Sequence, residues 1–301
     1  MRVQAWIDEQ AESGDLAEPA SCKMIRQLHL GFYEEAPDEL LRVKGKTVEF
    51  LMQPGEWRTS PEHDVVVGRH VPPSSNVVAA FMQRFEQRYS FAHLGKGARI
   101  LAIPAAHHRF NYVHPFPDGN GRVSRLMSHA MAHKAGIAAH GLWSVSRGLA
   151  RGLESRGEYK QMMDLADTPC KGDLDGRGNL SQGALEEFTL WFLRICIDQV
   201  QFMTDMFDLT SLSDRYQRFV IRHESLKPES AKLLLEALMR GEFERGEAPR
   251  ITGLPERTAR RVLNDVVEQG LLASRTPKGP VSLRFPADVL DEIFPKLYPL
   301  S

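Results

Sequence analysis

The sequence has little cysteine and no long apolar run. Its 301 residues include three cysteines, Cys22, Cys170 and Cys196, which lie far apart and form no CxxC pair. Neither a disulfide framework nor a cysteine zinc site is therefore indicated. No apolar run approaches the roughly 18–20 residues of a membrane helix, and the N-terminal MRVQAWIDEQ does not resemble a signal peptide. These absences predict a cytoplasmic protein that does not interact with a membrane.

An excess of charge of one sign is also absent. The chain has 38 Lys and Arg residues against 39 Asp and Glu, a net charge of −1. This balance excludes a protein that binds polyanions over its whole surface, although it allows a local basic patch. Hydrophobic residues make up 42% and charged residues 26%, which is typical of a folded protein. The length suits two domains of about 150 residues each.

The N-terminal third is predicted to be helical with one β-hairpin. Residues 1–56 form an N-terminal helical segment, with a helix over Cys22–Tyr33 and a loop after it. Two short β-prone runs follow, at 57–59 and 65–68, separated by turn residues around Pro61. This spacing predicts a hairpin.

Apolar residues at helical spacing dominate the next part of the chain. They predict that residues 57–210 form one helical domain that includes the hairpin. The expected helices begin at Val77, cover Pro104–Val113, run from Asn120 to about Lys134, and cover 185–206.

The C-terminal part is predicted to be a separate unit. Residues 211–227 are expected to form a linker helix, and residues 228–301 contain three short helical patterns followed by two β-prone runs around a turn. Pro255 opens the third helix at a position where proline is tolerated, and Gly270 ends it. Three helices and a hairpin in so short a segment predict a winged helix-turn-helix domain.

The most informative stretch is HPFPDGNGRVSR, from His114 to Arg125. Two glycines flank Asn120 where a helix begins, so several backbone N–H groups and the helix dipole favour a bound phosphate there. Arg122 and Arg125 can reach further phosphate oxygens. Asp118 offers a hard carboxylate for Mg²⁺, and a neutral His114 could take a proton from an attacking hydroxyl. Together these residues predict nucleotidyl or phosphoryl transfer.

The alternative is a structural turn between two helices with arginines on a solvated face. A structural turn, however, does not require a histidine, an aspartate and two arginines at fixed spacing. The stretch resembles the signature of the Fic family, H-x-F-x-D/E-G-N-G-R-x-x-R, with every specified position filled. The resemblance implies a mainly α fold: a Fic-type helical bundle with a β-hairpin flap, joined here to the winged helix domain.

The resemblance also implies an activity, the transfer of AMP from ATP to a hydroxyl group of a protein, with Mg²⁺. His114 is then the catalytic base and Asp118 the metal ligand. The family often has two tyrosines near the adenine pocket, and here the first is Glu158. The residues that the resemblance assigns to ATP are Val67, Gly68, Arg69 and His70 of the flap, Asp118, Gly119, Asn120, Gly121, Arg122 and Arg125 of the signature, and Tyr159.

The expected partner is a target protein that presents a Ser, Thr or Tyr hydroxyl to the flap, and a homodimer is left open. Two alternatives also stay open. One is a winged-helix transcription regulator with a Fic-like sensor domain, and the other is transfer of a different phosphate-linked group. Many Fic proteins carry an inhibitory helix with S/T-x-x-x-E-G/N, which this sequence lacks. We expect that segment to lie upstream of Met1 or in another protein, or to be missing.

Two smaller patterns lie outside the signature, one on a C-terminal helix and one in a pair of histidines. Arg257, Arg260, Arg261 and Asn264 share one face of the expected third C-terminal helix, which suits contact with DNA; a face that docks a protein is the alternative. His129 and His133 lie four residues apart, as metal ligands can. Because no carboxylate nearby in the sequence completes a set, solvated or packed histidines are the favoured interpretation.

Overall fold

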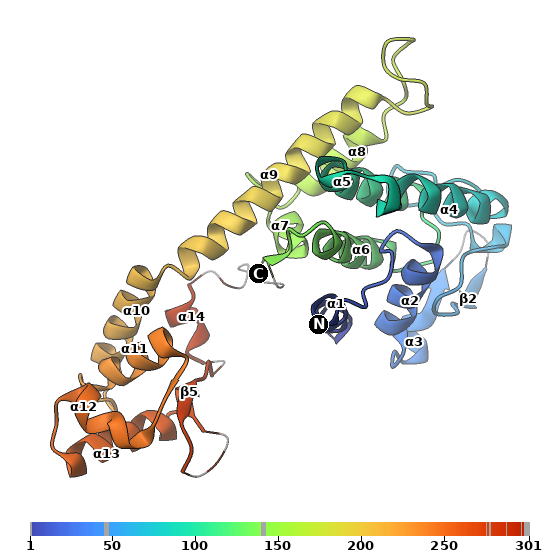
Figure 1. Ribbon diagram of the computed structural model, residues 1–301. Coiled ribbons are helices and arrows are strands. Elements are labelled where there is room, and N and C mark those ends of the chain that lie inside the picture. Colours follow the sequence, from blue (N-terminus) through green and yellow to red (C-terminus); the bar gives the residue numbers. More distant parts are fainter. Residues whose placement is uncertain are drawn as a thin grey trace. The chain divides into compact units, whose positions relative to one another are not determined.

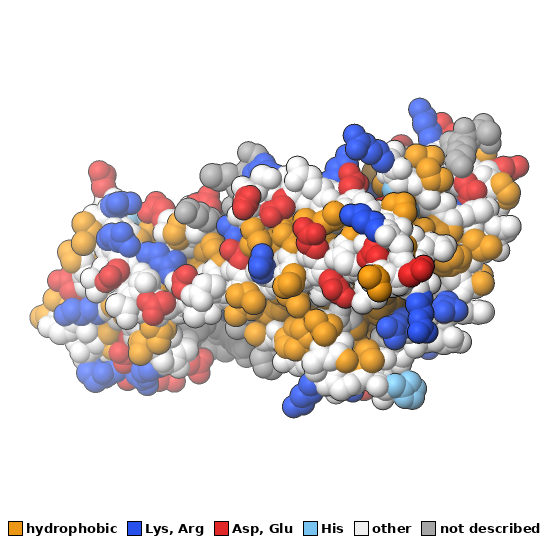
Figure 2. Space-filling model, turned by 90° about the horizontal axis from the view of Figure 1, so that it is seen from above, with side chains coloured by type: hydrophobic (Ala, Val, Ile, Leu, Met, Phe, Trp, Pro, Cys, Tyr) orange, Lys and Arg blue, Asp and Glu red, His pale blue; other side chains and the backbone are white. Residues whose placement is uncertain are grey.

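The computed structural model describes residues 2–44, 48–139, 143–274, 276, 278–286, 288–295 and 297. The chain divides into two compact units, 1–201 and 202–301. None of the helices in the described ranges combines the length and apolar character that a membrane span requires. On the face seen in Figure 2, acidic and basic side chains are interspersed, in keeping with the net charge near zero.

A central helix, α6 (Asn120–Lys134), organises the first unit. It packs against α5, α1, α2 and α7 (Figure 1), and apolar side chains such as Val123, Met127 and Met131 are fully buried along it. The predicted bounds of α2 and α6 are confirmed, whereas α5 begins at Lys96 and not at Pro104. The helices of this unit are α1 (Arg2–Ser13), α2 (Cys22–Tyr33), α3 (Asp38–Leu41), α4 (Ser75–Tyr89), α5 (Lys96–Val113), α6, α7 (Val145–Arg151), α8 (Glu158–Ala166) and α9 (Gln182–Met206), which runs into the second unit.

The predicted hairpin was placed wrongly. The antiparallel pair is β1 (Arg42–Lys44) with β2 (Glu49–Leu51), in a stretch that the sequence assigned to the N-terminal segment. Residues 57–59 form no strand, because the backbone N–H of Arg58 donates to the carbonyl of Pro115 and is thereby withdrawn from a ladder. What remains of the expected hairpin is one bridge, between Val67 and His70.

The second unit begins earlier than the sequence suggested. Its core includes Leu212, Tyr216 and Phe219 of α10 (Leu209–Arg222), so the expected linker helix belongs to this unit. Three helices and two strands follow in the predicted order, and β3 joins them in a sheet of order β3-β5-β4. The winged-helix assignment stays a prediction. The elements are α11 (Ser230–Arg240), β3 (Glu242–Phe243), α12 (Ala248–Thr252), α13 (Glu256–Glu268), β4 (Leu272–Ala273), β5 (Val281–Leu283) and α14 (Leu290–Ile293).

Candidate active site

The loop from His114 to Gly119 connects α5 to α6, and its backbone is left-handed at both ends. His114 has φ 49° and Gly119 has φ 80°. A Cβ atom at position 119 would lie 2.8 Å from the ring of Tyr33, so both conformation and space require glycine there. At Gly121 a Cβ atom would meet nothing within 4 Å. The surrounding protein therefore does not explain Gly121, whereas close approach of a ligand to the helix N-terminus would.

The side chain of Asn120 holds the loop closed. Its Oδ1 accepts from the backbone N–H of Phe116 at 2.9 Å, and its Nδ2 donates to the carbonyl of Phe116 at 2.8 Å. Among the described residues, the backbone N–H groups of Asn120 and Gly121 donate to no carbonyl, as expected in a first helical turn. Asn120 can therefore contribute its backbone, but not its side chain, to a bound phosphate.

His114 has the tautomer that a base requires. Its Nδ1 lies 3.3 Å from the carbonyl of Asn111, an acceptor, so Nδ1 carries the proton and Nε2 carries the lone pair. Burial lowers the pKa of His114 to about 4, and the nearby charges of Arg58 and His70 act in the same direction. The imidazole is therefore neutral at pH 7 and can accept a proton through Nε2.

Two residues, Tyr33 and Arg122, orient the carboxylate of Asp118 through one of its oxygens. The hydroxyl of Tyr33 donates to Oδ2 at 2.7 Å, and Arg122 Nη2 lies 3.5 Å from the same atom. Arg122 Nη1 also donates to the tyrosine hydroxyl at 2.6 Å. Although burial opposes it, hydrogen bonds from Tyr33 and the Gly119 backbone lower the pKa of Asp118. Among the described residues no side chain hydrogen-bonds to or forms an ion pair with Oδ1, so an ionised oxygen remains for a cation.

His29, on α2, also supports the loop between α5 and α6. It stacks on Phe116 with ring centroids 3.8 Å apart and accepts at Nδ1 from the N–H of Gly55. Nε2 therefore carries the proton and donates to the carbonyl of Asp118 at 3.2 Å. Since His29 and Tyr33 lie one turn apart on α2, this helix fixes both the backbone and the side chain of Asp118.

Arg125 faces the cavity without a carboxylate partner among the described residues. Its Nε is buried and makes no hydrogen bond, and its Cζ lies 5.5 Å from the ring centroid of Tyr159. Tyr159 is held by His107, whose Nε2 lies 2.9 Å from the phenol oxygen. A cation stacked on an aromatic ring and otherwise unpaired is prepared to bind an anion.

Arg58 links the loop to the flap, the segment 59–73. It is 1% exposed and donates from Nε to the carbonyl of His114 at 2.7 Å. Nη1 pairs with Asp64 at 2.6 Å, and Nη2 donates to the carbonyls of Pro73 and Val113. One buried guanidinium therefore connects the flap to the residue that carries the base.

The tip of the flap is a tight turn anchored by His70. Val67 and His70 exchange two backbone hydrogen bonds of 3.0 Å, and Gly68 has φ 61° in the turn between them. His70 Nδ1 lies 3.1 Å from Asp167 Oδ2, and Nε2 lies 2.8 Å from the carbonyl of Tyr112. Although burial opposes it, the Asp167 carboxylate raises the pKa of His70. The His70 side chain thus fixes the flap and is not available to a ligand.

Two adjoining cavities meet at Asp118, Arg122 and Arg125. One, of about 800 Å³, lies between the signature loop and Val65–Val67 of the flap, and His114 opens into it. The other, of about 780 Å³, is bounded by α1, α2 and α6. Volumes of this size accommodate a nucleotide.

The structure therefore brings most of the predicted site residues to one place. The first cavity is lined by most of them: His114, Asp118, Gly119, Asn120, Gly121, Arg122, Arg125 and Val67. Tyr159 lines neither cavity and lies beneath Arg125. Sequence reasoning missed three buried polar residues, His29, Tyr33 and Arg58. The spacing of His29 and Tyr33 on one helix face was a usable signal, whereas a single arginine between turns gave none.

In the second unit the four predicted contact residues lie together on α13. Arg257, Arg261 and Asn264 are exposed, and with Glu256 and Arg260 they border a shallow hollow of about 560 Å³. Arg260 is paired with Glu256 at 2.6 Å, which reduces the basic character of this face. Contact with DNA or protein through α13 stays a prediction.

Comparison with known proteins identifies the signature-bearing region. The profile described as Fic/DOC family matches residues 23–132. Over this stretch, which holds the signature, the chain is similar to the Fic/DOC family. "Protein adenylyltransferase Fic" of Drosophila erecta is 38% identical over 82 residues, and the protein of the same name from Drosophila ananassae is 39% identical over 82 residues. Each match covers 27% of this chain and 16% of the relative, so the similarity spans about a sixth of those proteins.

Two solved structures also resemble the chain. A Fic family protein from Desulfovibrio desulfuricans G20 matches with a TM-score of 0.47 and 17% identity, over 95% of this chain and 74% of that one. A Fic domain containing signaling protein from Bacteroides thetaiotaomicron VPI-5482 matches with a TM-score of 0.44 and 16% identity, over 67% of this chain and 68% of that one.

Proposed function

We propose that the first unit contains a Fic domain that transfers AMP from ATP to a hydroxyl side chain of a target protein. The observation that carries the proposal is the first cavity, where a neutral imidazole, an open helix N-terminus, a half-exposed carboxylate and two arginines face one another under the flap. The names of the curated Drosophila relatives, protein adenylyltransferases, support the choice of nucleotidyl transfer.

In the proposed reaction, the target hydroxyl oxygen forms a bond to the α-phosphorus of ATP. The bond between that phosphorus and the bridging oxygen breaks, and pyrophosphate leaves with the electron pair. The hydroxyl proton passes to Nε2 of His114, which is unprotonated in the resting state. The N–H groups of Asn120 and Gly121 and the two arginines hold the phosphates in line, and this positioning supplies much of the rate.

The donor set at Asp118 suits Mg²⁺. Its Oδ1 is a hard ionised oxygen without a side-chain partner among the described residues, and the phosphates of ATP would supply further oxygens. When bound, Mg²⁺ would neutralise phosphate charge. Tyr33 and Arg122 keep the carboxylate pointing into the cavity, and His29 holds its backbone.

The flap offers a docking strip for the target segment. Val66, Val67 and Val71 are 54%, 43% and 64% exposed, an unusual run of apolar side chains at the mouth of a polar site. An extended segment could bind there through backbone hydrogen bonds while its hydroxyl faces His114. The position of the flap is fixed by Arg58 and His70, so the strip is preorganised.

Comparison of ATP labelled at the α-phosphate with ATP labelled at the γ-phosphate tests the proposal. The purified chain, alone and with a cell lysate, is incubated with Mg²⁺ and either α-³²P-ATP or γ-³²P-ATP. We expect protein labelling from the α position only, including labelling of the chain itself, because no carboxylate within the described ranges blocks Arg125. Labelling from the γ position would indicate kinase chemistry, and no labelling from either would favour the sensor alternative. α-³²P-UTP in a parallel reaction tests for UMP transfer.

Replacing Arg125 by alanine should weaken ATP binding about 10- to 100-fold and ADP binding much less. The reason is that the proposal assigns this otherwise unpaired guanidinium to the γ-phosphate, and a charge-assisted hydrogen bond in a cleft contributes about 1.5–3 kcal/mol. Calorimetric Kd values for the two nucleotides check it, with the exposed Arg84→Ala on α4 as control. Equal losses for ATP and ADP would contradict the assignment.

A further inference from the structure

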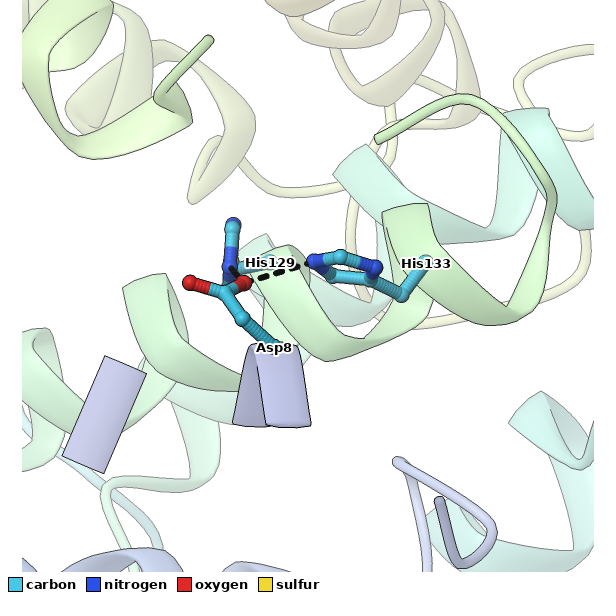
Figure 3. Close-up of side chains that lie close together, drawn as sticks. All are labelled: Asp8, His129 and His133. Carbon is cyan, nitrogen blue, oxygen red and sulfur yellow. Dashed lines mark hydrogen bonds and ion pairs between the residues drawn. The ribbon is translucent and has the colours of Figure 1, made fainter. Parts of the chain in front are cut away.

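A cluster of three potential metal ligands lies on the side of α6 that faces α1. Asp8 comes from α1, and His129 and His133 come from successive turns of α6 (Figure 3). The sequence interpretation of the two histidines as solvated or merely packed was based on the lack of a nearby carboxylate. The fold supplies that carboxylate from 121 residues away in the chain.

The geometry of the cluster is convergent. Nε2 of His129 lies 2.6 Å and Nε2 of His133 lies 2.8 Å from the same oxygen, Oδ1 of Asp8. The two rings are nearly perpendicular, at 84°, and the three ligand atoms lie within 4.8 Å of one another. In Figure 3 both imidazoles point at the carboxylate from one helix face.

The two histidines of the cluster are also largely shielded from water. The side chains of His129 and His133 are 7% and 8% exposed, and that of Asp8 is 27% exposed. Two imidazole donors share one carboxylate oxygen, while no side chain in the described ranges hydrogen-bonds to the second oxygen. A single cation between the two Nε2 atoms and the Asp8 oxygen would take the place of the two N–H protons. It would give each of these three polar atoms a bonding partner.

We propose that Asp8, His129 and His133 bind a divalent late transition metal, with Zn²⁺ as the fitting ion. Two imidazole nitrogens and one carboxylate oxygen form a ligand set that Zn²⁺ accepts and that Mg²⁺ does not favour. Tetrahedral Zn²⁺ bonds of about 2.0–2.1 Å place ligand atoms about 3.3 Å apart. The two Asp8 distances therefore need to open by less than about 1 Å, which side-chain rotation can supply.

The fourth coordination position can be taken by water. His129 borders the second cavity, which also reaches Arg122 and Arg125, so the cluster is connected to solvent on that side. The ion would cross-link α1 to α6 one turn beyond Arg125. Its role would be to hold the N-terminal helix against the helix that carries the signature arginines, and this role is independent of the proposed transfer reaction.

Zinc titration of the metal-free protein tests the site, without nucleotide and with excess Mg²⁺ to occupy oxygen sites. We expect one equivalent of Zn²⁺ to bind with a submicromolar Kd and to raise the Tm by about 5–10 °C at 100 times the Kd. Asp8→Asn and His133→Gln should each weaken binding by about 100-fold, because each removes one of three protein ligands. His93→Gln, an exposed histidine of the same unit, should bind like the parent.

A spectroscopic measurement distinguishes coordination from nonspecific binding. Co²⁺ in place of Zn²⁺ should give intense visible absorption from a tetrahedral site in the parent protein and in His93→Gln, but not in the two ligand variants. Circular dichroism confirms that the variants are folded. Zinc binding that is equally tight in parent and His133→Gln, or the lack of a tetrahedral Co²⁺ spectrum in the parent, would overturn the proposal in favour of a hydrogen-bonded triad alone.

Discussion

His114→Ala is expected to lower the rate of AMP transfer by about 10²–10⁴-fold while ATP still binds. The variant loses the one imidazole ring among the described residues that line the first cavity, whereas the helix N-terminus, the arginines and Asp118 remain. Single-turnover transfer from α-³²P-ATP gives the rate, and calorimetry gives the affinity. The exposed His93→Ala serves as the matched control. Equal transfer by parent and His114→Ala would contradict the assignment of the base.

The pH dependence of the parent enzyme provides a second test of the same residue. Burial lowers the pKa of His114 to about 4, and the base works only when neutral. As the pH falls from 7, kcat/KM should therefore persist below the ordinary histidine pKa of about 6.5 and decline only near 4. A decline in kcat/KM centred near pH 6.5 would show instead that the imidazole titrates like an exposed histidine.

Folding must be followed in that experiment, because His29 and His107 are also buried as neutral rings with pKa values lowered to about 4 and about 3. A histidine whose pKa is lower in the folded state than in the unfolded state contributes stability above the unfolded pKa of about 6.5. This contribution is lost as the pH falls below that value. Stability should thus decrease between about pH 6.5 and 4, so circular dichroism at each pH separates loss of fold from loss of base.

The sequence predicted those parts of the site that are encoded locally. Gly119 and the arginines one turn apart specify a helix start and a cationic face within twelve residues, and the structure has both. The loop closure by the Asn120 side chain was not predicted. The approximate bounds predicted for helices α2 and α6 agree with the structure, because apolar positions and end signals coincide there.

The sequence could not predict contacts between distant segments. Tyr33 reaches Asp118 across 85 positions, Arg58 reaches the His114 carbonyl across 56, and Asp8 reaches His129 across 121. None of these pairs leaves a periodic or compositional pattern, since each depends on how separate segments of the chain pack. The hairpin error has a related cause: strands of three residues, such as β1 and β2, carry too few side chains to show alternation.

Arg58→Met is expected to destabilise the first unit by about 3–5 kcal/mol, the effect of breaking a buried ion pair by removing one partner. Methionine fills similar space but leaves Asp64 without its cation and three carbonyls, of Pro73, Val113 and His114, without a donor. Asp64 would keep one contact, since its Oδ1 also accepts from the backbone N–H of Ser75 at the start of α4. Urea denaturation followed by circular dichroism measures the free energy of unfolding. The exposed Arg69→Met in the same flap should change it by less than about 0.5 kcal/mol.

Arg58→Lys separates charge from geometry. Lysine retains the cation for Asp64, but an ammonium group cannot place donors on the carboxylate and on carbonyls from two other segments in one plane. We therefore expect an intermediate loss of stability, together with weaker transfer, because the carbonyl of His114 loses its fixed donor and the imidazole shifts with it. If Arg58→Lys is as stable and as active as the parent, the buried charge alone holds the flap, and the four directed hydrogen bonds are incidental to positioning the base.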